Sequence, residues 1–331
     1  MADTFPAYLV SRTDAGQTTE CKRLSENDLM PGDVTIKVEY SGLNYKDGLA
    51  LTGKAPIIRR FPMIPGIDLS GTVVRSEHPG FRTGDAVVLT GFGIGEIHYG
   101  GYAGMARVNG DWLLHLPAGL TSRQAMIIGT AGYTAMQCVM ALENHGIEPE
   151  SGDILVTGAT GGVGSFAVSL LAKRGYRVIA ATGRPEEKDY LTGLGAAEIF
   201  DRHELTGMAR PLGREHWIGA IDVAGGNILA NVLSHISYGG AVTACGLADS
   251  MELPASVAPF ILRGITLYGI SSVMSPMKKR GAAWARLTRD LDPDELDKMS
   301  SEIGFDELPN TALEILAGRI RGRTVVKIPD S

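Results

Sequence analysis

A glycine-rich turn at residues 158–164 constrains the fold of this chain more than any other feature. The apolar run DILVT (153–157) leads into GATGGVG (158–164), and SFAVSLLAKR (165–174) follows, with Gly175 as a stop signal. This order predicts a strand, a tight turn and a helix. Glycines let a bound group approach the backbone, and the first N–H groups of a helix attract anions. We therefore expect a main-chain anion site, although the spacing differs from strict G-x-G-x-x-G and an ordinary glycine-rich turn is the alternative.

The segment before this turn is typical of a mainly β domain. Short strand-like runs, separated by turn residues, occur at 7–10, 34–40, 71–74, 86–89 and 112–116. At residue 121 the pattern becomes helical, because TSRQ (121–124) resembles a capping box ahead of the apolar segment 125–142. A domain boundary is therefore expected near residue 122.

Strand and helix patterns alternate after the turn. Further strands are expected at 176–182, 198–200, 218–223, 241–245 and 265–270, and helices at 185–194, 227–236 and around 255–262. Together with the strand at 153, they predict the α/β class, a doubly wound parallel (Rossmann) sheet with its ligand at the carboxyl ends of the strands. Helices are also expected at 278–291 and 309–317. The last strand, 322–328, has no partner left in this sheet and is assigned to the β domain. The predicted domains are 1–122 with 272–331, and 123–271.

Composition excludes several classes of protein. The 331-residue chain has a net charge of −6 and no block of five like charges, which argues against a nucleic-acid partner. Cys21, Cys138 and Cys245 have no C-x-x-C spacing, so neither a disulfide framework nor a structural zinc site is expected. The first residues lack the features of a signal peptide, and no run of about 18 apolar residues is evident. We expect a cytoplasmic, soluble protein without a membrane partner.

The end of the second strand of the parallel sheet indicates the cofactor. NAD-binding folds place an acidic residue there, whereas cations and small donors accommodate a 2′-phosphate. Here the strand ends in Thr182, Gly183 and Arg184, with Lys188 one turn later. Arginine binds phosphate bidentately, so the pattern favours NADPH over NADH. The alternative for Arg184 is a solvated surface side chain, and the same two readings stay open for Arg202.

Several motifs resemble the medium-chain dehydrogenase/reductase superfamily. They are GLNYKD (42–47), PGIDLSG (65–71), GTAGYTA (129–135) and TGATGGVG (157–164). The resemblance implies a GroES-like β domain that accompanies the nucleotide-binding fold. Zinc alcohol dehydrogenases place a cysteine near the position of Asn44 and a Gly-His-Glu where this chain has Gly66-Ile67-Asp68. Both ligand positions are changed, so the resemblance is to the zinc-independent quinone and enoyl reductases, and no metal is expected.

The requirements of the two reactions also favour a zinc-independent reductase. Oxidation of an alcohol without a Lewis acid needs another group to stabilise the alkoxide, and none is evident. Reduction of an activated C=C bond needs a hydride, hydrogen-bond donors for the developing enolate and one proton source.

Five longer strings narrow the resemblance to the family of NADPH-dependent acryloyl-CoA reductases. They are TGKAPIIRRFPMIPG (52–66), GEIHYGG (95–101), MIIGTAG (126–132), APFILR (258–263) and GRTVVK (322–327). This family would reduce the C=C bond of acryloyl-CoA to give propanoyl-CoA. The alternatives are a quinone or enone reductase and, from another class, a non-catalytic NADPH-binding sensor.

The resemblance also implies the site residues. Tyr45, beside the nicotinamide, would order the ribose or relay a proton, or else pack in the core. Asn44 and Asp47 would act in catalysis or serve a turn, and Asp68 would orient Tyr45 or Lys46, or cap the backbone. The cofactor contacts implied are Tyr45, Thr130, Thr160, Gly161, Gly162, Val163, Thr182, Gly183, Arg184, Arg202, Leu247, Ile261 and Ser272.

The phosphates of CoA require cations at the entry to the site. The candidates are Lys54, Arg59, Arg60, Arg321 and Arg323, each with a solvated surface residue as the alternative. His98 is either an acid or a hydrogen-bonded loop residue. The apolar strand 265–270 would expose a sheet edge unless it were paired, which predicts a homodimer.

Overall fold

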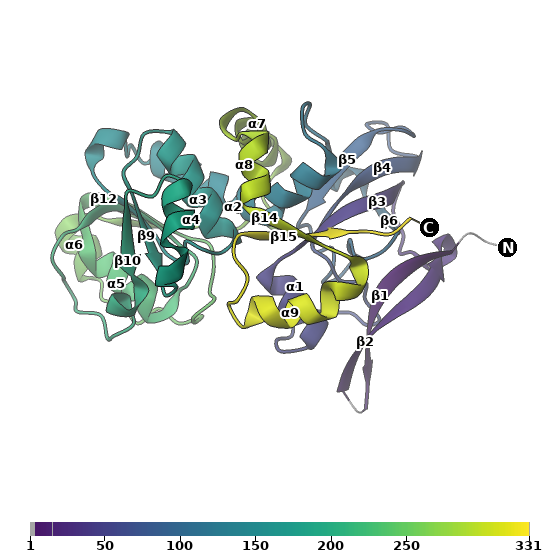
Figure 1. Cartoon of the computed structure of the whole chain (residues 1–331), viewed down its shortest axis with the longest axis horizontal. Helices are drawn as coiled ribbons and strands as arrows, with labels where there is room; N and C mark the ends of the chain where they lie inside the picture. The colour runs from purple at the N-terminus through teal and green to yellow at the C-terminus, as the bar shows by residue number, and fades with distance from the viewer. Residues whose placement is uncertain (1–3, 15, 331) are drawn as a thin grey trace. The chain divides into compact units, whose positions relative to one another are not determined.

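Residues 4–14 and 16–330 are described by a computed structural model, and their packing divides the chain into two units (Figure 1). The first unit contains residues up to Thr130 and from Val273 onward, and the second contains Ala131–Ser272. The first division lies beyond the predicted position at 122/123, because helix α2 (Ser122–Asn144) begins in the first unit and ends in the second. Residues 1–3, part of the segment judged to lack signal features, lie outside the described residues.

The first unit is built on a mixed, mainly antiparallel sheet. Its strand order is β14-β15-β3-β4-β5-β7, and β6 pairs with β3. The strands are β3 (Val34–Leu43), β4 (Asp68–Ser76), β5 (Ala86–Thr90), β6 (Met105–Val108), β7 (Leu114–His115), β14 (Ser300–Ile303) and β15 (Arg323–Lys327). Strand β15 pairs antiparallel with β3, with Val326 opposite Ser41. The prediction that the last strand returns to the β domain is therefore confirmed.

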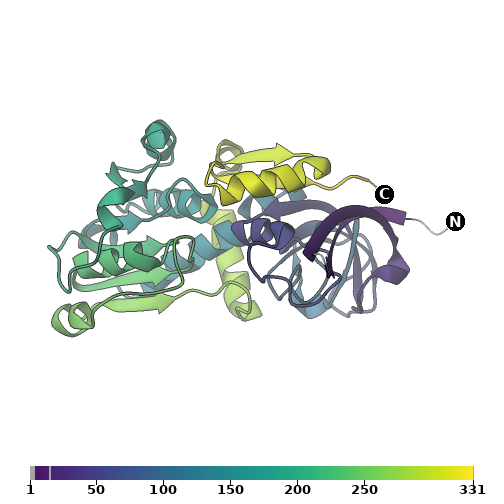
Figure 2. The same ribbon diagram turned by 90° about the horizontal axis from the view of Figure 1, so that it is seen from below.

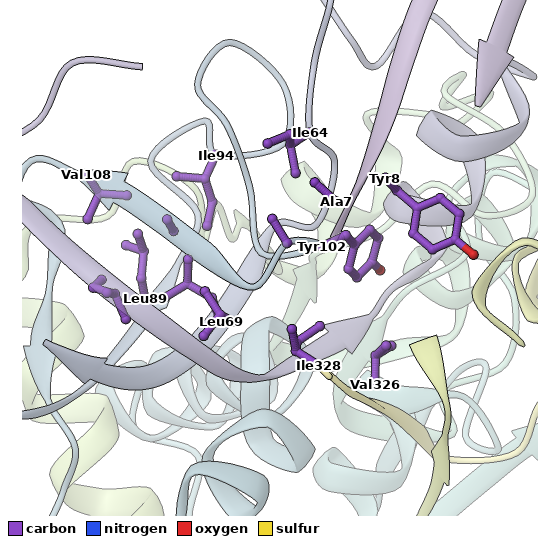
Figure 3. Packing of buried hydrophobic residues seen from close by; sticks show 14 of the residues in the cluster. Ala7, Tyr8, Ile64, Leu69, Leu89, Ile94, Tyr102, Val108, Val326 and Ile328 are labelled. Atoms are coloured by element: carbon purple, nitrogen blue, oxygen red, sulfur yellow. The ribbon is translucent and has the colours of Figure 1, made fainter. Parts of the chain in front are cut away.

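A two-stranded sheet and four α-helices, besides the start of α2, accompany this sheet in the described part of the first unit. They are β1 (Thr4–Thr13), β2 (Gly16–Ser25), α1 (Tyr45–Thr52), α7 (Met277–Asp290), α8 (Pro293–Lys298) and α9 (Leu308–Leu316). Helix α9 packs on α1 (Figure 2), where a side chain at Gly48 would lie 2.9 Å from Ile315 Cγ2. The core gathers apolar side chains from distant strands, including Leu69 of β4, Leu89 of β5 and Val326 of β15 (Figure 3).

The second unit is a six-stranded parallel sheet. Its order is β10-β9-β8-β11-β12-β13, so the chain starts in the middle and winds outward to each edge. The strands are β8 (Ile154–Val156), β9 (Val178–Thr182), β10 (Glu198–Asp201), β11 (Trp217–Asp222), β12 (Ile236–Ala244) and β13 (Thr266–Gly269). The helices are α3 (Gly162–Lys173), α4 (Lys188–Gly193), α5 (Gly226–His235) and α6 (Ala258–Arg263). The predicted doubly wound α/β fold is confirmed, and β8 and β11 mark its switch point.

Helix α2 is capped as the sequence indicates and then broken. Gln124 N donates to Thr121 Oγ1 at 3.2 Å, and Thr121 N donates to Gln124 Oε1 at 3.0 Å. The helix is interrupted at Gly129, whose φ of 45° and ψ of −154° are not helical. Contrary to the expectation, α2 is long and apolar enough to cross a membrane, the one such helix in the described part of the chain. Because 78% of its most apolar window is buried within the protein, it is a core helix.

Candidate active site and cofactor site

The turn after β8 has the shape that its glycines require. Gly158 adopts a φ of 56°, and a Cβ at Gly164 would lie 2.2 Å from the Gly158 oxygen, so a larger residue cannot fit there. Gly161 is the N-cap of α3, and the nearest atom to a Cβ there would be 3.4 Å away. The N–H groups of Gly162, Val163 and Gly164 open the helix and have no intrahelical acceptor. The turn can therefore accept a phosphate through main chain alone.

A buried carboxyl group anchors this turn to the neighbouring strand. Asp222, the last residue of β11, is fully buried, and its Oδ1 accepts from Thr157 Oγ1 at 2.7 Å. Its Oδ2 accepts from the N–H groups of Ala224 and Gly225 at 3.2 and 2.8 Å. Burial raises the pKa of Asp222 to about 6. Sequence reasoning missed this contact, although the place of Asp222 at a strand end beside the switch point was a usable signal.

Two arginines lie at the carboxyl end of β9. Thr182 Oγ1 accepts from Arg184 N at 3.0 Å, and the Arg184 guanidinium donates to the Thr160 carbonyl in the glycine turn at 3.4 Å. Arg202 lies over Gly183, where a Cβ would be 2.5 Å from Arg202 Nε. The end of β9 thus presents a hydroxyl and Arg184, and the segment after β10 adds Arg202. A hydroxyl and two cations suit a 2′-phosphate better than a ribose hydroxyl.

Three further cofactor candidates lie in the second unit. Leu247 follows β12 and Ser272 follows β13, so both come after the carboxyl ends of strands, as the fold requires for a ligand. Ile261 lies on α6, which connects these two strands. Leu247 and Ile261 are 57% and 73% exposed, so each presents an apolar side chain that a ligand could cover.

In the first unit, Asp68 organises a buried polar cluster. Its Oδ2 accepts from Asn44 Nδ2 at 2.9 Å and from Thr130 N at 3.0 Å, and its Oδ1 accepts from Thr130 Oγ1 at 2.5 Å. Asp68 therefore orients Asn44 and Thr130. Lys46, one of the partners considered for Asp68, pairs instead with Glu96 at 2.9 Å. Asn44 and Thr130, predicted as separate contacts, are brought together by one carboxylate.

A second carboxyl group, Asp47, is fully buried beside Asp68. Its Oδ2 accepts from both Asn44 N and Asn44 Nδ2, at 2.9 and 3.0 Å, and its Oδ1 accepts from Ile67 N at 3.0 Å. Burial raises the pKa of Asp47 to about 7, and the neighbouring charge of Asp68 adds to this shift. Asp47 therefore stabilises the N-cap turn of α1, which is the turn role among the two considered for it.

Arg323 completes the cluster, and its prediction as a cation for CoA phosphates is wrong. It is only 3% exposed, and its guanidinium donates to Asn44 Oδ1 and to the Ile127 carbonyl, both at 2.9 Å. Its Nη2 lies 3.8 Å from Asp68 Oδ2. An arginine enclosed in this way compensates buried carboxylates and presents no donor to a ligand in solution.

The Asp68–Arg323 pair also stabilises the break in α2. Arg323 donates to the carbonyls of Met126 and Ile127, which precede the break, and Asp68 accepts from the N–H of Thr130, which follows it. A cation at the C-terminal end of one helical segment and an anion at the N-terminal end of the next both match the helix dipole. Asn44 and Asp68, which stand at the two segments compared above with the zinc ligands of alcohol dehydrogenases, are thus joined by a hydrogen bond in this chain.

The remaining candidates differ in exposure. Tyr45, the first residue of α1, is 41% exposed, so its phenol is accessible. Lys54, Arg59, Arg60 and Arg321 are also exposed. His98 is buried, its Nε2 lies 2.7 Å from the Arg107 carbonyl, and burial lowers its pKa, all of which favour the structural loop role. Within the described residues, no group of three or more His, Cys, Asp or Glu side chains forms a candidate metal site.

The buried carboxyl of Asp47 predicts a pH dependence of stability. Its pKa rises from 3.8 in the unfolded chain to about 7 in the folded one. Its stabilising contribution is therefore fully present below the unfolded pKa and is lost as pH rises through about 7. Between pH 5 and 7 the free energy of unfolding should fall by roughly 2 kcal/mol more in the wild type than in Asp47→Asn.

Urea unfolding at both pH values tests this expectation. The change in unfolding free energy with pH is compared between the two proteins, rather than their absolute stabilities. The amide that replaces the Asp47 carboxyl also faces Ile67 N and changes the stability by itself. The exposed Asp306→Asn is the control and should keep the wild-type slope. Equal slopes for the wild type and Asp47→Asn would contradict the assignment.

Comparison with known proteins places this arrangement in a family. Residues 30–118 match the family model described as "Alcohol dehydrogenase GroES-like domain", and residues 162–288 match "Zinc-binding dehydrogenase". The "Probable acrylyl-CoA reductase AcuI" of Escherichia coli K12 is 52% identical over 97% of this chain and 99% of its own length. The "Acrylyl-CoA reductase AcuI" of Ruegeria pomeroyi is 49% identical over 98% of this chain and 99% of its own.

A solved structure agrees with these relatives. The crystal structure of the yhdH oxidoreductase from Salmonella enterica in complex with NADP has a TM-score of 0.96 and 52% identity, and the match covers 98% of this chain and 100% of that one. The chain therefore belongs to the medium-chain dehydrogenase/reductase superfamily, in the quinone-oxidoreductase-like branch that contains the acrylyl-CoA reductases.

Proposed function

We propose that this protein is an NADPH-dependent reductase of the C=C bond of acryloyl-CoA or a similar short enoyl thioester. The observation that carries the proposal is its near-complete alignment, at about half identity, with two relatives named acrylyl-CoA reductase. The phosphate-accepting turn and the paired arginines at the end of β9 support the choice of NADPH.

The residues of this chain divide the work of the reaction. NADPH, when bound, supplies the hydride that adds to the β-carbon of the thioester. The N–H groups at the start of α3 would hold the cofactor pyrophosphate, and Arg184 and Arg202 would hold the 2′-phosphate. Tyr45 donates a hydrogen bond toward the thioester carbonyl, where enolate charge develops, and passes on the proton that the α-carbon gains. The overall reaction consumes acryloyl-CoA, NADPH and one proton and yields propanoyl-CoA and NADP⁺.

A panel of acceptors tests this function. The decrease in NADPH absorbance is followed with acryloyl-CoA, crotonyl-CoA, a benzoquinone and no acceptor. We expect the highest kcat/KM with acryloyl-CoA. Faster turnover of the quinone would favour a quinone reductase, and no turnover with any acceptor would leave only a non-catalytic NADPH-binding protein. Loss of activity with a zinc chelator would contradict the metal-independent assignment.

Replacing Arg184 with Ala is expected to raise the KM for NADPH by roughly 10- to 100-fold, because hydrogen bonds to a charged group contribute about 1.5–3 kcal/mol. The KM for NADH should change less than about twofold, since NADH lacks the 2′-phosphate. Initial rates over a range of each cofactor measure both values. The exposed Arg210→Ala, in the same unit, is the matched control. Equal effects on the two cofactors would contradict a 2′-phosphate role.

We also infer a cytoplasmic homodimer. Strand β13 is an edge of the parallel sheet in the described residues, and an unpaired edge strand favours pairing with a second copy. Light scattering that gave the mass of one 35.1 kDa chain would contradict this inference.

A further inference from the structure

A partly buried ion pair links α1 to the glycine-rich loop at 91–101. Lys46, the second residue of α1, lies 2.9 Å from Glu96 Oε1, and their side chains are 33% and 13% exposed. Lys46 directly follows Tyr45, the residue proposed to act on the thioester. The pair therefore fixes the first turn of α1 from outside the helix.

The charge of Lys46 is unusual for its position. A cation near the N-terminus of a helix is disfavoured by the helix dipole, by about 0.3–1 kcal/mol in exposed cases. Asp47 follows immediately, but its carboxyl is occupied by Asn44 and Ile67. The Glu96 carboxylate is thus the acidic partner that offsets this cost.

The loop that bears Glu96 is held firmly against the segment that leads into Asp68. A Cβ at Gly100 would lie 2.2 Å from the Gly66 oxygen, and one at Gly101 would lie 2.2 Å from the Asp68 oxygen. Gly101 N also donates to the Gly66 carbonyl at 2.9 Å. Because the backbones approach so closely, Glu96 has a defined place relative to the buried cluster.

Glu96 also contacts the loop with the candidate CoA cations. Its carbonyl accepts from Arg59 N at 3.0 Å. Ile58, next to Arg59, is only 6% exposed and packs with Val10 and Met63, so the backbone at this point is anchored. Burial raises the pKa of Tyr99 and the charge of Arg60 opposes this shift, so Arg60 lies close to the same loop. Glu96 therefore contacts Lys46 through its side chain and the basic loop through its main chain.

We propose that Glu96 is a positioning residue that couples binding of the substrate's phosphates at Arg59 and Arg60 to the orientation of Tyr45. The inference rests on the proposed function, because the phosphates that bind Arg59 and Arg60 are taken to be those of the nucleotide half of CoA. Phosphates that bind Arg59 and Arg60 pull on this anchored segment, and the hydrogen bond from Arg59 N transmits the force to the backbone of Glu96. The Glu96 carboxylate then holds Lys46, and with it the start of α1. Binding energy from a remote part of a substrate is used in this way when it lowers the barrier at the reacting atoms.

A truncated substrate separates coupling from general structural support. The kinetics of the wild type and Glu96→Ala are measured with acryloyl-CoA and with the acryloyl thioester of pantetheine, which lacks the nucleotide phosphates. We expect Glu96→Ala to lower kcat for acryloyl-CoA by about fivefold and to change kcat for the pantetheine thioester by less than about twofold. The matched control is Glu302→Ala, which removes the Arg123–Glu302 pair (2.7 Å) elsewhere in the same unit and should change neither value.

A charge exchange provides the second readout. The double variant Lys46→Glu with Glu96→Lys restores the pair and places an acid at the helix N-terminus, where it is favoured. It should recover most of the lost kcat with acryloyl-CoA. Equal losses with both thioesters, or no recovery in the double variant, would overturn the coupling role. If the wild type does not reduce acryloyl-CoA at all, the proposed function fails first, and that outcome is distinct from a failure of the coupling.

Discussion

Replacing Arg323 with Met is expected to lower the free energy of unfolding of the first unit by about 3–5 kcal/mol. Methionine fills a similar volume but has no charge, so Asp68 and Asp47 would remain buried without a cation. The carbonyls of Met126 and Ile127, beside the break in α2, would also lose their donor. The cost arises mainly from the uncompensated carboxylates that remain.

Urea unfolding followed by tryptophan fluorescence measures this loss. In a Trp217→Phe background the two remaining tryptophans, Trp112 and Trp284, both lie in the first unit. Arg319→Met is the control, because its ion pair with Glu314 is exposed to solvent and its loss should leave the stability nearly unchanged. Removing the anion as well, in Asp68→Asn with Arg323→Met, should restore part of the stability. A loss below about 1 kcal/mol for Arg323→Met alone would contradict the role of Arg323 as the internal counter-ion.

Tyr45→Phe is expected to lower kcat for acryloyl-CoA by about 100-fold, within the range for loss of a positioned proton donor. The ring and its packing are retained, and Tyr45 is 41% exposed, so the fold should not change. The KM for NADPH should stay within about twofold of the wild-type value. A lower kcat with an unchanged KM for NADPH would show that the hydroxyl stabilises the transition state and does not contribute to cofactor binding.

The same experiment distinguishes the second role considered for Tyr45. If the phenol orders the cofactor ribose, Tyr45→Phe should raise the KM for NADPH and leave kcat nearly unchanged. Tyr268→Phe is the matched control, because Tyr268 lies in the second unit and its hydroxyl is 2.9 Å from His145 Nδ1. An unchanged kcat with an unchanged KM would contradict both roles.

The second unit was the part of the fold that sequence could predict well. Its strands are short apolar runs between turn residues, and each crossover returns to the same parallel sheet, so local patterns determine the arrangement. The glycine turn, Thr182 and Arg184 were found because each has a fixed place relative to a strand end. Asp222 was missed, since its partner Thr157 is adjacent to it only after β8 and β11 have paired.

The first unit required information that no local pattern contains. Strands β2 and β14 were not expected, because their polar sequences gain stability from pairing with β1 and β15 rather than from their own propensity. Helix α1 was missed because it has only eight residues and depends on its cap and on α9. The role of Arg323 could not be read from GRTVVK, since its partners are Asn44, Asp68 and the end of the first half of α2, all far away in sequence.

The return of β15 to the first sheet affects the order in which the molecule can be completed during synthesis. The second unit is one continuous segment, so all of its strands have been translated before Val273 is reached. The first unit is interrupted, and β3 lacks its β15 neighbour until residues 323–327 leave the ribosome. Until then Asp68 also lacks its cation. The nucleotide-binding half can thus become protease-resistant on stalled ribosomes before the N-terminal half, although that half is made earlier, because the N-terminal half still lacks β15.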